Sequence, residues 1–274
     1  MDQNQKPRKL AIIGAGKIGE AIFSALIHSG GYDPSDIIVT SYSAERKAWL
    51  ARTYGVTAAE SNTDAVKQAG DVILGVKPQM ASKIVKEIAP ALNGDHLLIS
   101  VLAGVTTADL EKHLSEKTPV VRAMPNTPCR IARGMTALCG GSNSGSAHLD
   151  RAEQLFKPVG RTVQISEKHF DAITGLSASG PAFIYIMIES LAEGGVKAGL
   201  PRSVATELAA QACLGAASMV LETNAHPALL KDEVTTPAGC TIDGILKLEE
   251  GGIRVTLIKA VMEAAQKAEM LGRE

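Results

Sequence analysis

The stretch IIGAGKIGEA, residues 12–21, determines how the first half of the chain folds. Gly14, Gly16 and Gly19 have the spacing GxGxxG, directly after a predicted strand and directly before a predicted helix. There the first glycine permits a tight turn, the second lets backbone approach a pyrophosphate, and the third lets helix pack on strand. The helix N-terminus then faces the anion. We expect this turn to bind a dinucleotide; the alternative is a glycine-rich turn without a ligand.

Short apolar runs alternate with helical segments over residues 9–166 and are predicted as strands. They are KLAII, DIIVTS, DVILGV, HLLISVLA, PVVRAM, GMTALC and RTVQIS. The early runs are apolar throughout rather than alternating, as expected for strands buried on both faces of a parallel sheet. We therefore expect an α/β domain, residues 1–167, with a mainly parallel, doubly wound sheet covered by helices on both faces.

The rest of the chain, residues 168–274, is predicted to be all helical. Segments 181–198, 202–222 and 242–271 are rich in Ala, Leu, Ile and Met. Some of them, such as ELAAQACLGAASMVL, are apolar on more than one face, and such a helix must be covered on both sides. In so small a domain, this pattern predicts packing against another subunit.

Composition favours a small-molecule partner. The 274 residues include 28 Lys+Arg and 29 Asp+Glu, so no net field attracts nucleic acid or an anionic membrane. Cys129, Cys139, Cys213 and Cys240 lack CxxC spacing, which favours a reducing compartment. No signal peptide and no apolar run of the roughly 18 residues needed to span a bilayer are predicted. We expect a cytoplasmic protein that binds neither nucleic acid nor membrane.

The end of the second predicted strand bears on the choice of cofactor. An acidic residue there would bind the ribose 2′-hydroxyl of NAD, but IIVTSYSAERK has Ser41, Tyr42 and Ser43 instead, with Arg46 and Lys47 behind them. Hydroxyls and cations suit a 2′-phosphate. The pattern favours NADPH over NADH; the alternative is that the two cations form the solvated face of the next helix.

Residues just beyond other predicted strands are further candidates, because ligands of a doubly wound sheet collect at the C-terminal ends of its strands. Lys77 and Pro78 follow one strand, Ala103 and Gly104 follow the next, and Asn126 follows a third. Small residues and prolines there predict rigid loops that a ligand can approach closely. The alternative for Lys77 is an ordinary exposed lysine at a strand end.

Two polar segments interrupt the helical half. TGLSASGPAF, residues 174–183, is predicted as a polar loop that begins a helix with Pro181 in the first turn, which needs no function to explain it. In VTTPAGCTIDGIL, residues 234–246, Thr241 is predicted as an N-cap and Asp243 lies in the first turn. Backbone N–H groups and hydroxyls converge there and suit the carboxylate of a small substrate. The alternative is a well-capped helix without a ligand.

Six motifs together resemble the pyrroline-5-carboxylate reductase family and occur in the family's order. They are IIGAGKIGEAI, VKPQ, RAMPNTP, GLSASGPAFIYIMIE, AEGGVKAGLPR and HPALLKDEVTTPAGCTIDGILKLE. The last is the most specific. The chain departs from the family pattern at Ala238, where glycine is more usual, and at Cys240, where Thr or Ala is common; neither change removes a group with an expected chemical role.

The resemblance implies a Rossmann domain followed by an all-α dimerisation domain. It implies reduction of 1-pyrroline-5-carboxylate to L-proline, the last step of proline biosynthesis, with NADPH or NADH as the cofactor. The implied assembly is a homo-oligomer, either a dimer or a decamer built of dimers, in which the partner's loop completes each active site.

The resemblance, together with the motifs, also predicts the roles of particular residues. Thr241 is expected to hydrogen-bond the substrate's ring nitrogen, and Lys77 to give electrostatic help. The predicted cofactor-binding residues are Gly14, Ala15, Gly16, Lys17, Ile18, Gly19, Ser41, Tyr42, Ser43, Arg46, Asn62, Val76, Lys77, Pro78, Ala103 and Gly104. The predicted substrate-binding residues are Ser179, Thr235, Thr236, Gly239, Cys240 and Thr241. No metal is expected, because a cyclic imine is already a good electrophile and the histidines lack metal-binding spacing.

Two alternatives remain open. The β-hydroxyacid dehydrogenases also join a Rossmann half to a helical half, but they use a lysine where the helical region begins, and SASGPAFIYIM has none. A cofactor-sensing protein without turnover is the second alternative, since fold alone never fixes function. Such a sensor would not need the carboxylate-sized loop TTPAGCT.

Overall fold

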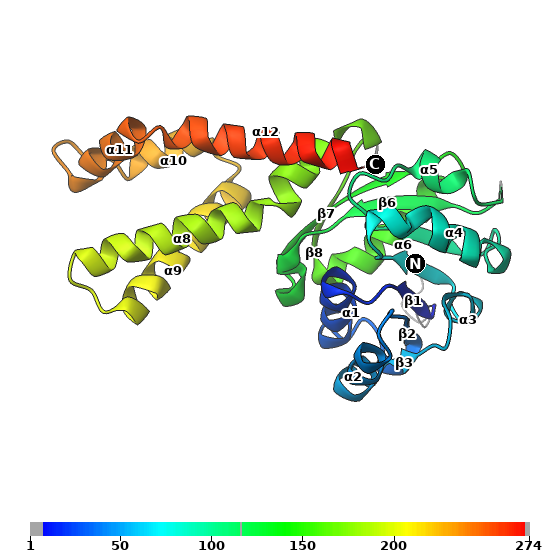
Figure 1. Ribbon diagram of the computed structural model, residues 1–274. Coiled ribbons are helices and arrows are strands. Elements are labelled where there is room, and N and C mark those ends of the chain that lie inside the picture. Colours follow the sequence, from blue (N-terminus) through cyan, green and yellow to red (C-terminus); the bar gives the residue numbers. More distant parts are fainter. Residues whose placement is uncertain (1–7, 116, 272–274) are drawn as a thin grey trace. The chain divides into compact units, whose positions relative to one another are not determined.

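A computed structural model describes residues 8–115 and 117–271, arranged as two compact units (Figure 1). The first unit contains Met1–Ala178 together with Glu263–Glu274, and the second contains Ser179–Met262.

The first unit is built on one sheet with the strand order β3-β2-β1-β4-β5-β6-β7-β8. The strands are β1 Leu10–Ile13, β2 Ile37–Val39, β3 Thr57–Ala58, β4 Asp71–Leu74, β5 Leu97–Ser100, β6 Val120–Met124, β7 Gly134–Gly140 and β8 Gly160–Gln164. Only the β6–β7 pair is antiparallel among the strand pairs described. The chain runs outward from β1 to β3 and then crosses to β4 on the other side of β1. The predicted mainly parallel, doubly wound sheet is confirmed.

Helices cover both faces of this sheet. They are α1 Lys17–His28, α2 Ala44–Tyr54, α3 Asn62–Lys67, α4 Ala81–Ile88, α5 Thr107–Glu111, α6 Ser146–Phe156 and α7 Phe170–Ile173. Alternate residues of each central strand enter different cores: Leu10 and Ile12 of β1 pack with α1, α2 and α6, whereas Ala11 and Ile13 pack with α3, α4 and α5.

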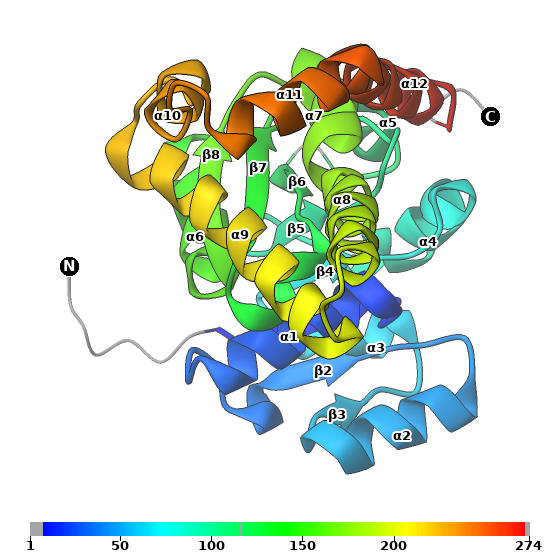
Figure 2. The same ribbon diagram turned by 90° about the vertical axis from the view of Figure 1, so that its left-hand side faces the viewer.

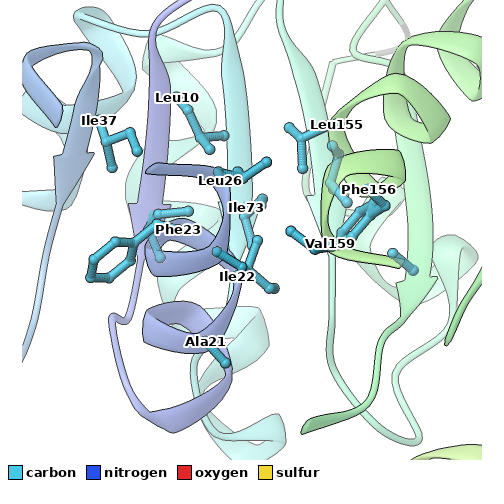
Figure 3. Packing of buried hydrophobic residues seen from close by; sticks show 14 of the residues in the cluster. Leu10, Ala21, Ile22, Phe23, Leu26, Ile37, Ile73, Leu155, Phe156 and Val159 are labelled. Carbon is cyan, nitrogen blue, oxygen red and sulfur yellow. The ribbon is translucent and has the colours of Figure 1, made fainter. Parts of the chain in front are cut away.

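Figure 3 shows part of the first of these cores. Residues of α1, α6 and three strands meet there: Ala21, Ile22, Phe23, Leu26, Leu155, Phe156, Leu10, Ile37 and Ile73. Burying one such large apolar side chain contributes about 1.5–3 kcal/mol. Burial on both faces explains why the strand sequences are apolar throughout.

The second unit is helical in its described residues, as predicted (Figure 2). Its helices are α8 Gly180–Lys197, α9 Arg202–Thr223, α10 Pro227–Glu233, α11 Cys240–Glu250 and the first part of α12 Ile253–Leu271. Two details differ from the sequence-based expectation. A further helix, α10, forms between the predicted segments 202–222 and 242–271, and the expected single helix over 242–271 is split at Gly252, whose φ of +68° is left-handed.

Helices α8 and α9 form a hairpin that packs through small residues. Ala192, Ala205 and Ala209 are buried between them, and a β-carbon at Gly195 would lie 3.0 Å from that of Ala205. At the hairpin's tip, Arg202 donates to both carboxylate oxygens of Glu193, at 2.6 and 3.2 Å. Large apolar side chains of both helices remain exposed.

Two helical stretches are long and apolar enough to cross a membrane by length and composition. They are Glu167–Lys197 and Arg202–Thr223, with mean hydropathies of 1.2 and 1.5. The expectation that no apolar run reaches this length is therefore wrong. It failed at 174–178 because this segment, expected to be a loop, is a π-helical turn that continues into α8. Only 11% of each apolar window is buried within the chain, so another surface must cover these helices.

Glu167 links three elements of the first unit. Its carboxylate accepts hydrogen bonds from the backbone N–H and the hydroxyl of Thr107, both at 2.8 Å, and pairs with Arg122 at 3.1 Å. The Arg122 side chain is only 3% exposed and its guanidinium lies 4.7 Å from the centre of the Phe170 ring. The carboxylate is thus the ionic partner of a buried cation.

We expect Glu167→Ala to lower the free energy of unfolding by about 2 kcal/mol, because the substitution leaves the buried Arg122 cation without its carboxylate. Urea unfolding at fixed protein concentration measures the change. Glu250→Ala removes a carboxylate from the exposed pair with Lys247 and should cost less than about 0.5 kcal/mol. Equal losses for the two variants would contradict the structural role of Glu167.

Candidate functional site

The three glycines of the first turn have different surroundings. Gly14 has a left-handed φ of +86°, and a β-carbon there would lie 2.8 Å from Val76 Cγ1. A β-carbon at Gly19 would lie 2.9 Å from Ile12 Cγ2, so α1 packs closely on β1. A β-carbon at Gly16 would meet nothing within 4 Å. Gly14 and Gly19 thus serve the fold, whereas Gly16 keeps open the space into which α1 begins.

Hydrogen bonds to Thr40, the residue directly after β2, hold this turn in place. The Thr40 carbonyl accepts from the N–H of Ala15 at 2.7 Å, and the Thr40 hydroxyl accepts from the N–H of Gly14 at 3.2 Å. Gly16 is the N-cap of α1, and no side chain caps the helix. The first turn of α1 therefore offers backbone N–H groups to an anion, which fits the pyrophosphate of a dinucleotide.

A pocket of about 690 Å³ lies at the C-terminal ends of β1, β2, β3 and β4. It brings together many of the predicted cofactor-binding residues: Gly14, Gly16, Ser41, Tyr42, Asn62, Val76 and Lys77. The predicted residues that do not line it are Ala15, Lys17, Ile18, Gly19, Ser43, Arg46, Pro78, Ala103 and Gly104. The volume is within the range of small-molecule and cofactor sites.

Sequence reasoning missed several residues of this pocket. They are Thr40, Glu60, Ser61, Gly75, Met80, Ile84 and Glu87. Lys47, which the sequence analysis named beside Arg46 as a cation suited to a 2′-phosphate, lines the pocket as well. Glu60 follows β3, a strand of 2 exposed residues without a periodic apolar signal. The acidic residue sought after the second strand was absent there, and a carboxylate enters the pocket from the third strand instead.

Arg46 is held beside the first helix. Its guanidinium pairs with Glu20 at 2.5 Å and lies 4.7 Å from the centre of the Trp49 ring. The second oxygen of Glu20 accepts from the Tyr54 hydroxyl at 2.7 Å. Burial raises the pKa of Glu20, but the hydrogen bonds from Tyr54 and Arg46 outweigh it and hold the pKa below its ordinary value. Glu20 is therefore charged at neutral pH.

Other predicted cofactor residues shape the surrounding turns. Ser43 caps α2 by accepting from the N–H of Arg46 at 3.2 Å. Gly104 has a left-handed φ of +74° in the turn after β5, and Ala103 packs against a small cluster that includes Phe170. Pro78 begins the short helical turn η2, Pro78–Met80, which Lys77 precedes as its N-cap.

Asn126, after β6, is tied to the π-helical turn at Thr174–Ala178. Its side-chain N–H donates to the Ser177 carbonyl at 3.2 Å, and its oxygen accepts from the N–H of Met135 at 2.9 Å. The segment predicted as a polar loop is thus a helical turn, and the Asn126 side chain donates a hydrogen bond to the Ser177 carbonyl of that turn. Pro181 does lie in the first turn of α8, as predicted.

The predicted substrate loop lies in the second unit, between α10 and α11. Gly239 is the N-cap of α11, with no side-chain cap, so the prediction that Thr241 caps this helix is wrong. Left-handed Ala238 reverses the chain, so α11 begins two residues earlier than expected. Asp243 lies in the first turn, as predicted.

The threonines of this loop are not equivalent. The Thr235 hydroxyl donates to the carbonyl of Lys231 at 2.7 Å and so closes the end of α10. The hydroxyls of Thr236 and Thr241 have no such bond within the part of the chain described. Gly239 donates to the Thr236 carbonyl at 3.0 Å. The loop thus gathers Thr236, Gly239, Cys240 and Thr241 at an uncapped helix N-terminus, while Ser179 is the N-cap of a different helix, α8.

Comparisons with known proteins cover both halves of the chain. Residues 9–104 match the family described as "NADP oxidoreductase coenzyme F420-dependent", and residues 167–271 match the family described as "Pyrroline-5-carboxylate reductase dimerisation". The first unit thus contains an NAD(P)-binding domain, and the helical part contains a dimerisation segment, which indicates a homo-oligomer.

Relatives match along almost the whole length. Pyrroline-5-carboxylate reductase of Glycine max is 42% identical over 96% of this chain and 95% of its own length. The crystal structure of Plasmodium falciparum pyrroline carboxylate reductase with NADP bound has a TM-score of 0.89 and 28% identity, over 98% of this chain and 100% of that one. A pyrroline-5-carboxylate reductase from Coxiella burnetii has a TM-score of 0.86 and 35% identity, over 96% and 98%. With the GxGxxG turn and the TTPAGCT loop both inside this full-length match, the chain belongs to the pyrroline-5-carboxylate reductase family.

Proposed function

We propose that this protein reduces 1-pyrroline-5-carboxylate to L-proline, the last step of proline biosynthesis, with NADPH or NADH as hydride donor. The observation that carries the proposal is the full-length match to pyrroline-5-carboxylate reductases. The chain also has the two parts that the reaction needs. One is an open dinucleotide turn at Gly16, and the other is an uncapped helix N-terminus with available hydroxyls at α11.

The nicotinamide cofactor, when bound, supplies the hydride that reduces the C=N bond. The N–H groups of the first turn of α1 would hold its pyrophosphate, and Ser41, Tyr42 and Asn62 line the same pocket. Lys77 precedes η2 and lines that pocket too, so it adds positive charge where an anionic ligand binds. The predicted residues outside the pocket support the turns around it.

The substrate carboxylate would bind the N-terminus of α11. No side chain caps that helix, so its first backbone N–H groups can donate to the carboxylate. We assign Thr241 a hydrogen bond to the ring nitrogen and Thr236 a place beside the carboxylate. Thr235 acts indirectly, because its hydroxyl already closes α10. Gly239 and Cys240 shape this turn, and Ser179 is assigned to the substrate from the α8 side.

A cyclic imine needs little activation, because its C=N carbon is electrophilic and becomes more so when the nitrogen carries a proton. The chain therefore has to orient the imine rather than supply a strong acid. A hydrogen bond from Thr241 at the nitrogen would act where charge changes during the reaction.

A second copy of the chain is the proposed cover for the exposed helices of the second unit. The match of 167–271 to a dimerisation family supports a protein partner rather than a lipid one. Whether dimers assemble further into a decamer stays a prediction. So do the functional division at 1–167 and 168–274 and the cytoplasmic location, which the free cysteines favour.

The direct test follows NADPH absorbance after addition of 1-pyrroline-5-carboxylate, with NADH in parallel. We expect consumption of the reduced cofactor and formation of proline in equal amounts. Folded protein that binds both nucleotides but turns over neither would contradict the proposed reaction and favour a cofactor-sensing protein.

Gly16→Ala and Gly14→Ala separate ligand space from backbone strain. Gly16→Ala adds a methyl group that meets no protein atom, so the melting temperature should change by less than about 2 °C while nucleotide Kd rises about tenfold or more. Gly14→Ala places a β-carbon at a left-handed residue against Val76, and should destabilise by about 2 kcal/mol or more. Nucleotide titration and thermal melting measure the two effects. Unchanged affinity in folded Gly16→Ala would show that no ligand approaches this turn.

Thr241→Ala should lower kcat by about tenfold to a hundredfold, because it removes the proposed hydrogen bond to the ring nitrogen. The Kd for NADPH should stay within about twofold, since the Thr241 hydroxyl is assigned to the imine and not to the nucleotide. Thr256→Ala is the matched control: its hydroxyl donates to the Gly252 carbonyl of its own helix at 3.1 Å, and its loss should spare kcat. Steady-state kinetics identical to the parent's would remove Thr241 from the mechanism.

A further inference from the structure

Four charged side chains line the nucleotide pocket: Lys47, Lys77, Glu60 and Glu87. Glu87 is already engaged, because one of its carboxylate oxygens accepts from the Asn62 side chain at 3.1 Å. Lys77 belongs to the β4 end of the pocket. Lys47 and Glu60 carry opposite charges and line the part of the pocket near β2 and β3. In folds of this class, the adenosine ribose binds near the end of the second strand.

Lys47 is held at this rim by a neutral group. Its ammonium donates to the Ala59 carbonyl at 3.3 Å, and Ala59 is itself fixed by its N–H bond to the Val39 carbonyl at 3.1 Å. An ammonium has three donors, so two remain for a ligand. Within the described residues, Lys47 forms no ion pair with any carboxylate.

Glu60 follows Ala59 in the sequence. Like the Lys47 ammonium, its carboxylate forms no ion pair with a described residue. The backbone before it is fixed at Ala59, and the backbone after it is fixed at Ser61, whose hydroxyl accepts from the N–H of Asp64 at 3.1 Å and so caps α3. The Glu60 carboxylate has no hydrogen bond or ion pair to any described residue. The rim therefore presents one free cation and one free anion to the same ligand.

Arg46, the other cation of this run, is committed elsewhere. Both oxygens of Glu20 are used by Arg46 and Tyr54, and the guanidinium also lies over Trp49. Turning Arg46 toward the pocket would leave a partly buried carboxylate without its cation, which is unfavourable.

We propose that Lys47 and Glu60 together set the preference of this protein between NADPH and NADH, and that Arg46 does not. A 2′-phosphate is a dianion for which the free ammonium of Lys47 is a suitable partner and the carboxylate of Glu60 a repulsive one. A 2′-hydroxyl reverses the roles, because it can donate to Glu60 and gains little from Lys47. The protein thus accepts both cofactors and discriminates by the balance of two opposed charges. This inference rests on the proposed function, since it concerns the cofactor of that reaction.

The test measures kcat/KM with each cofactor in Lys47→Gln, Glu60→Gln and Lys47→Arg. Lys47→Gln should lower the NADPH value about tenfold and leave NADH within about twofold. Glu60→Gln should raise the NADPH:NADH ratio about threefold or more. Lys47→Arg keeps the cation and should keep the ratio within about threefold of the parent's.

Two control variants separate this pair from general charge effects. Arg52→Gln removes an exposed cation from the same helix, and Arg46→Gln removes the cation held by Glu20; both should leave the ratio within about twofold. A ratio that falls as far in Arg46→Gln as in Lys47→Gln would overturn the proposal. Equal losses with both cofactors in Lys47→Gln would overturn it as well.

A binding measurement distinguishes failure of this inference from failure of the proposed reaction. Adenosine 2′,5′-bisphosphate and adenosine 5′-monophosphate differ only in the 2′-phosphate and need no imine substrate. Lys47→Gln should weaken the bisphosphate about tenfold and leave the monophosphate within about twofold. This outcome would uphold the inference even if no turnover were observed, and equal affinities in parent and variant would refute it.

Discussion

The close approach of β1 and β4 is the constraint on which the nucleotide site depends. The two strands pair in parallel over Leu10–Ile13 and Asp71–Leu74, and their exits touch: a β-carbon at Gly75 would lie 3.2 Å from the Gly14 carbonyl. The chain leaves β1 toward β2 and later returns to β4 on the other side of β1. The connections that follow β1 and β4 therefore run in opposite directions, and a crevice forms between them at the C-terminal ends of these strands. Every strand that lines the pocket contributes its C-terminal end, so the site follows from the strand order and from two glycines that allow the backbones to meet.

Much of this architecture could be predicted from the sequence because it depends on local patterns. Strands buried on both faces must be apolar throughout, and GxGxxG between strand and helix has few structural explanations, so β1, α1 and the sheet class were predictable. β3 was not, because its 2 residues are exposed and contribute nothing to either core. The strand at β7 was predicted, but its antiparallel direction against β6 was not, because an apolar run does not determine the direction of pairing. The π-helical turn at Thr174–Ala178 also escaped prediction, and it depends on a partner distant in sequence, Asn126, whose amide donates to the Ser177 carbonyl.

The candidate site divides in the same way. Residues whose role is steric, such as Gly14 and Gly19, are recognised by spacing alone. The role of a charged residue, by contrast, depends on which group it pairs with in the folded chain, and spacing does not reveal that group. Arg46 and Lys47 are neighbours in sequence and equivalent by composition, yet one is paired with Glu20 and the other lines the pocket. Similarly, the sequence cannot distinguish Thr235, whose hydroxyl closes α10, from Thr241.

The second unit poses a different physical problem, because it buries little of its own apolar surface. Among its described residues, the buried apolar side chains are only those of Ala192, Ala205 and Ala209, whereas Tyr185, Leu208 and others are more than half exposed. Ordering each residue costs about 1–2 kcal/mol of conformational entropy, and three alanines cannot offset that cost for such a unit. The missing stabilisation must come from association, and the dimerisation family that matches this segment indicates its source. The predicted substrate loop lies between two of these helices, so its geometry depends on assembly as well as on the chain's own fold.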